Sequence, residues 1–292
     1  MPMVIAVASG KGGTGKTLMA TGLARVVAAD GRSVVHLIDC DVEEPNAHLF
    51  LNPELVASEE VTLPVPLVDP AQCSLCGRCA EVCAFHAVAV VRDKVLVFPE
   101  LCHGCGSCAR QCPSRAISEE ARHLGRIALG RAGEVRFAQG LLDVGEAMAT
   151  PIIRTLKQRV IPAAEPSAVV FLDAPPGNAC PVVETLRHAD FALLVTEPTP
   201  FGRHDLAIAV EVARDGLGLP VGVVVNRDGT GDASVDAYCA DAGVPILLRI
   251  PHDRRIAEAY SDGRLWVDEL PEYREPLLRL YADIRERMRA RA

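Results

Sequence analysis

The sequence lacks the features that would direct a chain to a membrane, to secretion or to nucleic acid. No apolar run approaches the roughly 18 residues that a membrane span requires. Residues 1–10 contain no charged leader, long apolar core or cleavage signal. The net charge is −8, whereas phosphate binding along nucleic acid needs clustered Lys and Arg. We therefore expect a cytoplasmic protein for which membrane attachment and nucleic-acid binding are not expected.

Cysteine, by contrast, is abundant and unevenly placed, because eight of the eleven cysteines lie between residues 73 and 112. They form two runs with the same 2-2-3 spacing, namely Cys73, Cys76, Cys79 and Cys83, then Cys102, Cys105, Cys108 and Cys112. This spacing is typical of two-cluster bacterial ferredoxins, in which the fourth cysteine of each run ligates the other cluster. We therefore expect one [4Fe-4S] cluster on Cys73, Cys76, Cys79 and Cys112, and another on Cys102, Cys105, Cys108 and Cys83.

Two other uses of paired cysteines compete with this interpretation. A disulfide framework belongs in a secreted chain, and C-x-x-C pairs also bind zinc. The repeated 2-2-3 spacing favours iron-sulfur clusters over both. Gly77 and Gly106 supply turn freedom at equivalent points of the two runs. Pro113 follows the second run as the ferredoxin pattern requires, whereas Ala84 follows the first, which weakens that turn but leaves the ligands intact.

A phosphate-binding loop follows the first expected strand, residues 3–9. The sequence GKGGTGKT satisfies G-x-x-x-x-G-K-[ST] between a strand and an expected helix at 18–29. We expect its backbone to surround phosphate oxygens, with Lys16 on the β- and γ-phosphates and Thr17 on Mg²⁺. The residues expected to bind nucleotide here are Gly10, Gly12, Gly13, Thr14, Gly15, Lys16 and Thr17.

Two further strands, residues 33–39 and 168–173, end on the carboxylates Asp39 and Asp173. An apolar strand that ends on Asp has the form of a Walker B element, so we expect Asp173 to lie on the magnesium side. Asp41 stands two residues beyond Asp39. An alternative role for this acidic strand end is to cap the next helix.

The segment from Lys11 to Thr17 resembles the deviant Walker A motif of the MinD/ParA and nitrogenase iron protein class, which is related to cobyrinic acid a,c-diamide synthase domains. The resemblance implies a dimer, in which Lys11 contacts the ATP of the partner subunit. It also implies that Asp41 orients the attacking water, that Asp39 supports the magnesium shell, and that Asn226 and Arg227 read the base.

The remaining cysteines are isolated in the sequence. Cys180 lies seven residues after Asp173, a spacing similar to that of a cluster-ligating cysteine in nitrogenase iron proteins. No second cysteine is placed to complete such a site. We therefore expect Cys40, Cys180 and Cys239 to be small buried hydrophobic residues.

Strands alternating with helices predict an α/β fold, a P-loop NTPase with a parallel sheet flanked by helices. An inserted small α+β ferredoxin-like domain is expected to interrupt it. Residues 52–70 hold four prolines and are interpreted as a linker, short strands are expected at 125–129 and 134–138, and a helix at 140–159. The predicted domains are 1–62 and 121–292 for the ATPase and 63–120 for the insertion. A helix at 272–292 is expected to pack on the domain through Leu277, Tyr281, Ile284 and Met288.

The leading functional hypothesis is an ATPase whose nucleotide state controls electron transfer through two [4Fe-4S] clusters, to or from a redox partner protein. The active form is expected to be a homodimer, or a heterodimer with a related ATPase. Two alternatives stay open at this point. One is an ATPase that assembles or delivers iron-sulfur clusters, and the other is a spatial organiser of the MinD/ParA kind with a redox-sensing module.

Overall fold

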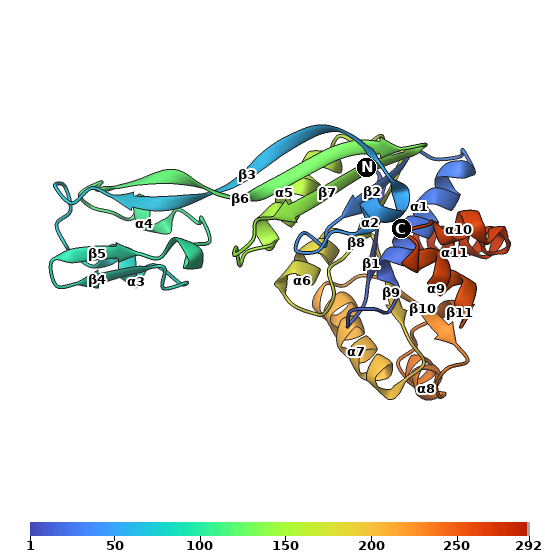
Figure 1. The fold of residues 1–292 in the computed structure, drawn as a ribbon. Helices are drawn as coiled ribbons and strands as arrows, with labels where there is room; N and C mark the ends of the chain where they lie inside the picture. Colours follow the sequence, from blue (N-terminus) through green and yellow to red (C-terminus); the bar gives the residue numbers. More distant parts are fainter. Residues whose placement is uncertain (291–292) are drawn as a thin grey trace.

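A nine-stranded sheet forms the body of the molecule, with helices on both of its faces (Figure 1). The structure is a computed structural model that describes residues 1–290. The strand order is β11-β10-β9-β1-β8-β2-β7-β6-β3. Neighbours from β11 to β7 run parallel, whereas β6 runs antiparallel to both β7 and β3. The predicted α/β sheet is therefore confirmed, with two antiparallel pairings added at one edge.

The elements alternate along the chain as the sequence predicts. The strands are β1 Met3–Ala8, β2 Val35–Asp39, β3 Glu54–Val68, β4 Val88–Val91, β5 Lys94–Val97, β6 Ile117–Ala132, β7 Val135–Leu142, β8 Val169–Asp173, β9 Phe191–Thr196, β10 Val221–Asp228 and β11 Ile246–Pro251. The helices are α1 Lys16–Ala29, α2 Ala47–Leu51, α3 Arg78–Glu81, α4 Ser107–Arg110, α5 Thr150–Val160, α6 Cys180–Leu186, α7 Pro200–Val210, α8 Ser234–Asp241, α9 Arg254–Ser261, α10 Trp266–Glu269 and α11 Arg274–Arg289. Short 3-10 segments occur at Pro99–Leu101 and Pro271–Tyr273, and a π-helical turn at Glu211–Gly216.

The central strands bury both faces, and each face has its own hydrophobic core. On β1, Val4 and Ala6 pack in the core that includes residues of α5 to α8, whereas Ile5 and Val7 pack in the core that includes α1 and α11. Because a parallel strand covered by helices on both sides needs no polar face, its sequence is a continuous apolar run. This explains why β1, β2 and β8 could be located from the sequence.

Two long strands, β3 and β6, leave the sheet together as a ribbon (Figure 1). β6 pairs with β7 only over residues 125–132, but it pairs with β3 as far as Val68 opposite Ile117. At the base of the ribbon the pairing shifts from Val61 opposite Gly125 to Thr62 opposite His123, which leaves Leu124 as a bulged residue. The Leu124 side chain is fully buried in the body and anchors the ribbon there.

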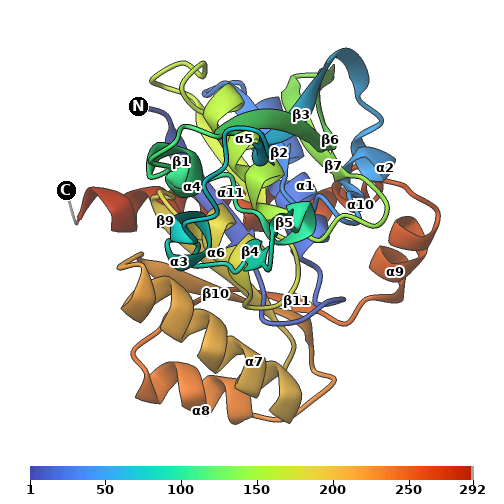
Figure 2. The same ribbon diagram turned by 90° about the vertical axis from the view of Figure 1, so that its left-hand side faces the viewer.

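The ribbon carries a small segment that we call the cysteine module, residues 69–116, and Figure 2 views the molecule with this module nearest the reader. It contains the β4–β5 hairpin and the short helices α3 and α4. Gly77 and Gly106 precede α3 and α4 with φ of 80° and 70°. Both glycines therefore adopt the left-handed backbone that the repeat predicts for them.

Two expectations about the chain around the module are wrong, namely the linker and the start of the helix that follows β7. Residues 52–70 are not a linker, because β3 occupies most of them. An edge strand uses only every second N–H in its ladder, so Pro64 and Pro66, two positions apart, are compatible with it. The strands expected at 125–129 and 134–138 belong to the longer β6 and β7, and β7 continues through Gly140, so that the helix expected at 140–159 begins only at Thr150. The predicted domain boundaries at 62/63 and 120/121 fall within β3 and β6.

The C-terminal helix packs on the body as predicted. Leu277, Tyr281 and Ile284 are buried beside α1, and Met288 packs against the same core. Residues 291–292 of the expected helix lie outside the described residues. Within residues 1–290, no helix has the length and apolar character needed to cross a bilayer.

Candidate nucleotide and cysteine sites

The glycine-rich loop joins β1 to the first residue of α1, where the expected phosphate site should lie. Gly13 and Gly15 have φ of 78° and 100°, a backbone region that side chains disfavour. At Gly10 an added Cβ would lie 2.3 Å from the Asp205 carbonyl oxygen, so only glycine fits. The loop and the start of α1 thus present backbone N–H groups to a common space.

The two predicted magnesium-side carboxylates lie next to each other at the ends of adjacent strands. Asp39 of β2 is in register with Asp173 of β8, and both are fully buried. Asp39 accepts hydrogen bonds at 3.0 Å from the backbone N–H groups of Asp41, Asn46 and Ala47. Its position therefore depends on the loop that contains Asp41, and this explains how the strand end also organises the start of α2.

Asp173 has no such backbone support. Within residues 1–290 neither carboxylate oxygen makes a hydrogen bond of good geometry, although Thr17 and Lys16 lie beside it. Burial and the charge of Asp39 raise the pKa of Asp173 well above its ordinary value, and burial raises the pKa of Asp39 to about 7. A buried carboxylate that lacks a partner, next to a threonine hydroxyl, fits a hard cation such as Mg²⁺.

Because of the raised pKa of Asp39, we expect the protein without magnesium to lose stability as the pH rises from 3.8 to about 7. The folded state holds a proton on Asp39 that the unfolded state releases, so the free energy of unfolding falls across this window. Relative to Asp39→Asn, wild type should lose up to about 1.4 kcal/mol per pH unit. Urea unfolding of both proteins in EDTA measures the difference, and a difference that does not vary with pH contradicts the prediction.

Lys16 is buried among three carboxylates. Burial lowers the pKa of Lys16, while the charges of Asp173, Asp41 and Asp39 act in the opposite direction. A lysine in this position balances the negative charge of the site and can bind a phosphate oxygen. The predicted grouping of Lys16, Asp39, Asp41 and Asp173 therefore occurs in the structure.

An open pocket extends from the phosphate loop. Lys16, Thr17 and Asp41 line one part, and Asn226 and Arg227 line another. The pocket also reaches side chains that the sequence did not single out, including Ile256 and Tyr260 of α9. Their apolar surfaces suit contact with a flat nucleotide base. No local sequence motif indicates that these two residues belong to the pocket.

A third residue to which the sequence gave no role, Glu197, forms ion pairs with two of the predicted residues. Glu197 follows β9 and is buried; it forms ion pairs with Lys11 at 3.1 Å and with Arg227 at 2.5 Å. Asn226 donates a hydrogen bond from Nδ2 to the Thr14 carbonyl at 2.8 Å and accepts one at Oδ1 from the Arg227 N–H at 3.0 Å. In this state Lys11 is therefore held by its own chain, and Asn226 supports the phosphate loop.

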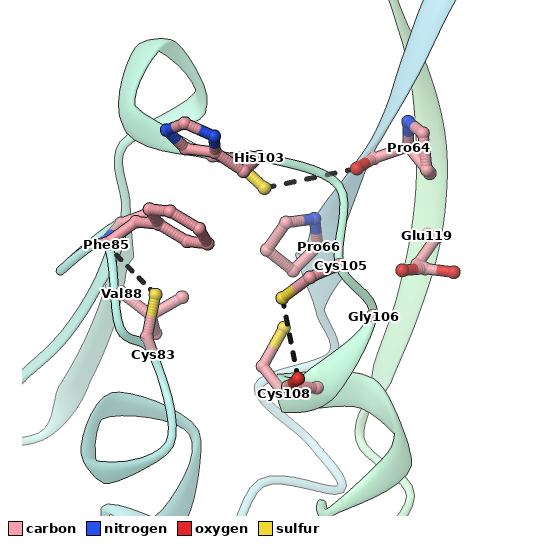
Figure 3. A pocket seen from close by; sticks show the side chains of 13 residues that line it. Pro64, Pro66, Cys83, Phe85, Val88, His103, Cys105, Gly106, Cys108 and Glu119 are labelled. Carbon is pink, nitrogen blue, oxygen red and sulfur yellow. Dashed lines mark hydrogen bonds between the residues drawn. The ribbon is translucent and has the colours of Figure 1, made fainter. Parts of the chain in front are cut away.

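In the cysteine module the eight cysteines divide between two cavities. The proximal cavity lies beside Pro64 and Pro66 of β3 and is lined by Cys83, Cys102, Cys105 and Cys108 (Figure 3). The distal cavity lies at the end of the ribbon and is lined by Cys73, Cys76, Cys79 and Cys112. In each cavity, three cysteines come from one run and the fourth from the other.

Backbone N–H groups point at several of the sulfur atoms. Ala87 and Ala116 donate to Cys83 and Cys112, each at 3.3 Å, at equivalent positions of the two runs. The hydrogen bonds that Cys105 makes with Ser107 and Cys112 makes with Ser114 lower the pKa of both thiols. Backbone N–H donors stabilise a thiolate, which is the form that ligates metals.

All eleven cysteines are free thiols, which leaves no disulfide framework. Among residues 1–290, no group of three or more His, Cys, Asp or Glu side chains converges closely enough to hold a single metal ion. Cys40 and Cys239 are buried as predicted, and burial raises the pKa of both. The expectation for Cys180 is wrong, because Cys180 is exposed at the start of α6.

Comparison with known proteins agrees with this geometry. Residues 5–266 match the family of CobQ/CobB/MinD/ParA nucleotide binding domains. The chain belongs to this family. It is 30% identical over 283 residues to the uncharacterized protein MJ0579 of Methanocaldococcus jannaschii, covering 94% of this chain and 96% of that one.

Two solved structures share the fold. The septum site-determining protein MinD of Pyrococcus horikoshii, complexed with Mg-ADP, has a TM-score of 0.61 and 19% identity, covering 97% of this chain and 96% of that one. The cell division ATPase MinD of Pyrococcus furiosus has a TM-score of 0.59 and 21% identity, covering 98% and 99%. At these identities the likeness establishes the fold of this CobQ/CobB/MinD/ParA family member and nothing finer.

Proposed function

We propose that this MinD/ParA-type ATPase couples its nucleotide state to electron transfer through two [4Fe-4S] clusters in the cysteine module. The observation that carries the proposal is the division of eight cysteines between two cavities, three plus one in each. That division is what the ligand exchange expected from the spacing of the two runs would require. When bound, the clusters supply one-electron carriers, which the side chains of the chain do not.

The cavity linings fit cubes better than single ions. In a [4Fe-4S] cube each thiolate binds a different iron, so the four sulfur atoms surround a volume and do not meet at one point. This agrees with two four-cysteine cavities in a module where no group converges on a single ion. On this proposal the distal cluster is held by Cys73, Cys76, Cys79 and Cys112, and the proximal one by Cys83, Cys102, Cys105 and Cys108.

On the nucleotide side, we propose that the pocket beside the phosphate loop binds MgATP and that the chain hydrolyses it to ADP and phosphate. Thr17, Asp39 and Asp173 would hold Mg²⁺, and Asp41 would orient the attacking water. The unpartnered carboxylate of Asp173 supports the cation site. The Pyrococcus horikoshii relative was solved with Mg-ADP, which is consistent with this assignment.

The same proposal includes a dimer and a redox partner. Lys11 would contact the nucleotide of a second subunit, either another copy of this chain or a related ATPase. For this it must leave Glu197, its ion-pair partner in the single chain. The partner protein would exchange electrons at the module, whose surface contains exposed apolar side chains such as Phe85 and Phe98.

Redox titration of anaerobically purified protein, followed by electron paramagnetic resonance, tests the coupling. We expect the potential of at least one cluster to differ by about 60 mV between MgADP and a non-hydrolysable ATP analogue, equivalent to about 1.4 kcal/mol for one electron. Equal potentials, with and without a partner protein, would contradict the proposal. Iron passing to an apo-protein would instead indicate cluster delivery, and ATP-dependent recruitment to a surface would indicate spatial organisation.

A further inference from the structure

One side chain on the ribbon contacts both the body and the cysteine module. Arg122, on the ribbon part of β6, forms an ion pair with Glu146 in the loop between β7 and α5. Its other terminal nitrogen, Nη1, donates a hydrogen bond to the Pro99 carbonyl at 3.2 Å. The side chains of Arg122 and Glu146 are only 17% and 19% exposed, so this contact is largely shielded from solvent.

On the module side, this contact ends next to a cysteine of the proximal cavity. The Pro99 carbonyl that accepts from Arg122 also accepts from the Cys102 N–H, at 3.1 Å. Cys102 lines the proximal cavity. The Arg122 guanidinium is therefore linked to Cys102, a predicted cluster ligand, through the Pro99 carbonyl that accepts from both.

On the body side, hydrogen bonds connect the loop that contains Glu146 with the segment that lines the nucleotide pocket. The Asp143 N–H donates to the Leu124 carbonyl at 3.0 Å, and the Asp143 carboxylate lies 2.9 Å from His123 Nδ1. The preceding residue, Leu142, donates its N–H to the Val42 carbonyl at 2.7 Å. Val42 directly follows Asp41, which lines the pocket.

We propose that Arg122 is a positioning residue that transmits the nucleotide state from the Asp41 loop to the proximal cavity. The inference rests on the proposed function, because it identifies the contacts through which the nucleotide state would affect the clusters. A two-stranded ribbon has little stiffness of its own, so side-chain contacts across its base determine where the module sits. Charge-assisted bonds of a guanidinium to a carboxylate and a carbonyl are strong and directional, which suits a link of this kind.

Hydrogen–deuterium exchange of the full-length, anaerobically purified protein tests the link. Exchange is compared between MgADP and a non-hydrolysable ATP analogue, in peptides that cover the phosphate loop, residues 97–104 and residues 119–125. In wild type we expect the analogue to change exchange in all three regions. In Arg122→Gln the phosphate loop should still respond, while residues 97–104 should lose their response.

Arg126→Gln is the matched control, because Arg126 lies on the same strand, is exposed and makes no ion pair within residues 1–290. It should behave as wild type. Glu146→Gln keeps the Arg122 bond to Pro99 but removes the charge on the body side. It should also lose the response of residues 97–104, and it preserves the test if Arg122→Gln folds poorly.

A response of residues 97–104 that persists in both Arg122→Gln and Glu146→Gln would overturn the inference. So would a wild-type module that does not respond while the phosphate loop does. Failure of the proposed function has a different signature, since it is determined by the reduction potentials of wild type. If the wild-type cluster potentials respond to the ATP analogue and residues 97–104 still respond in both variants, the proposed function holds. In that case the coupling does not pass through Arg122.

Discussion

Replacing Lys16 with alanine should lower the rate of ATP hydrolysis by about 100-fold or more, on the scale seen when one electrostatic donor to a reacting group is removed. Lys16 is buried between the phosphate loop and the carboxylates Asp39, Asp41 and Asp173. Without it, these acids would face the phosphates of MgATP without the positive charge that Lys16 places among them. Phosphate release from MgATP under single-turnover conditions measures the effect.

Lys94→Ala provides the matched control for this experiment. Lys94 is exposed at the start of β5 in the cysteine module, far along the ribbon from the pocket. This variant should hydrolyse ATP at the wild-type rate.

The proposed coupling adds a second expectation for Lys16→Ala, namely that the cluster potentials no longer differ between MgADP and the ATP analogue. If the Lys16→Ala protein hydrolyses ATP at the wild-type rate, Lys16 takes no part in the reaction.

The sequence predicted the body of the molecule where local chemistry is sufficient. β1, β2 and β8 are apolar on both faces, and the glycines after β1 can hardly serve another purpose. β3 was missed because its prolines resemble a linker, although an edge position makes them compatible with a strand. The part of β6 before Gly125 was missed for a related reason, because its residues are mostly exposed and form no continuous apolar face.

Contacts between distant residues set the limit of prediction within the sites. Glu197 stands 186 residues from Lys11, and no pattern around either residue indicates that they form an ion pair. Tyr260 and Ile256 of α9 line the pocket together with residues of the phosphate loop, which stands near the other end of the chain. The cysteines differ, because their spacing carries its own geometric requirement. The two-cavity division was therefore foreseen, while the ribbon that places the module away from the sheet was not.

The proposed exchange of ligands between the two runs leads to the second large effect that we expect. Cys112→Ser should remove the distal cluster and leave the proximal one, although Cys112 belongs to the run that otherwise lines the proximal cavity. Cys83→Ser should do the reverse. Each variant should therefore retain about four of eight iron atoms per chain, because each cluster contains four. Serine keeps the size of the side chain but does not supply the thiolate.

Iron and sulfide analysis of anaerobically purified protein, with electron paramagnetic resonance of the reduced state, distinguishes the outcomes. The distal and proximal sites are told apart by pairing each variant with Cys76→Ser or Cys105→Ser. Cys112→Ser combined with Cys76→Ser should lose no more iron than either alone, because both cysteines line the distal cavity. Cys112→Ser combined with Cys105→Ser should lose both clusters.

Cys180→Ser is the control for the loss of an exposed thiol outside the module, and it should retain all the iron. If Cys112→Ser and Cys105→Ser together lost only one cluster, the runs would each hold their own, and the exchange read from the cavities would be wrong. If none of the module variants changed the iron content, the cavities would not hold clusters. Electron transfer would then have no carrier in this chain, and the ribbon would serve the ATPase in another way.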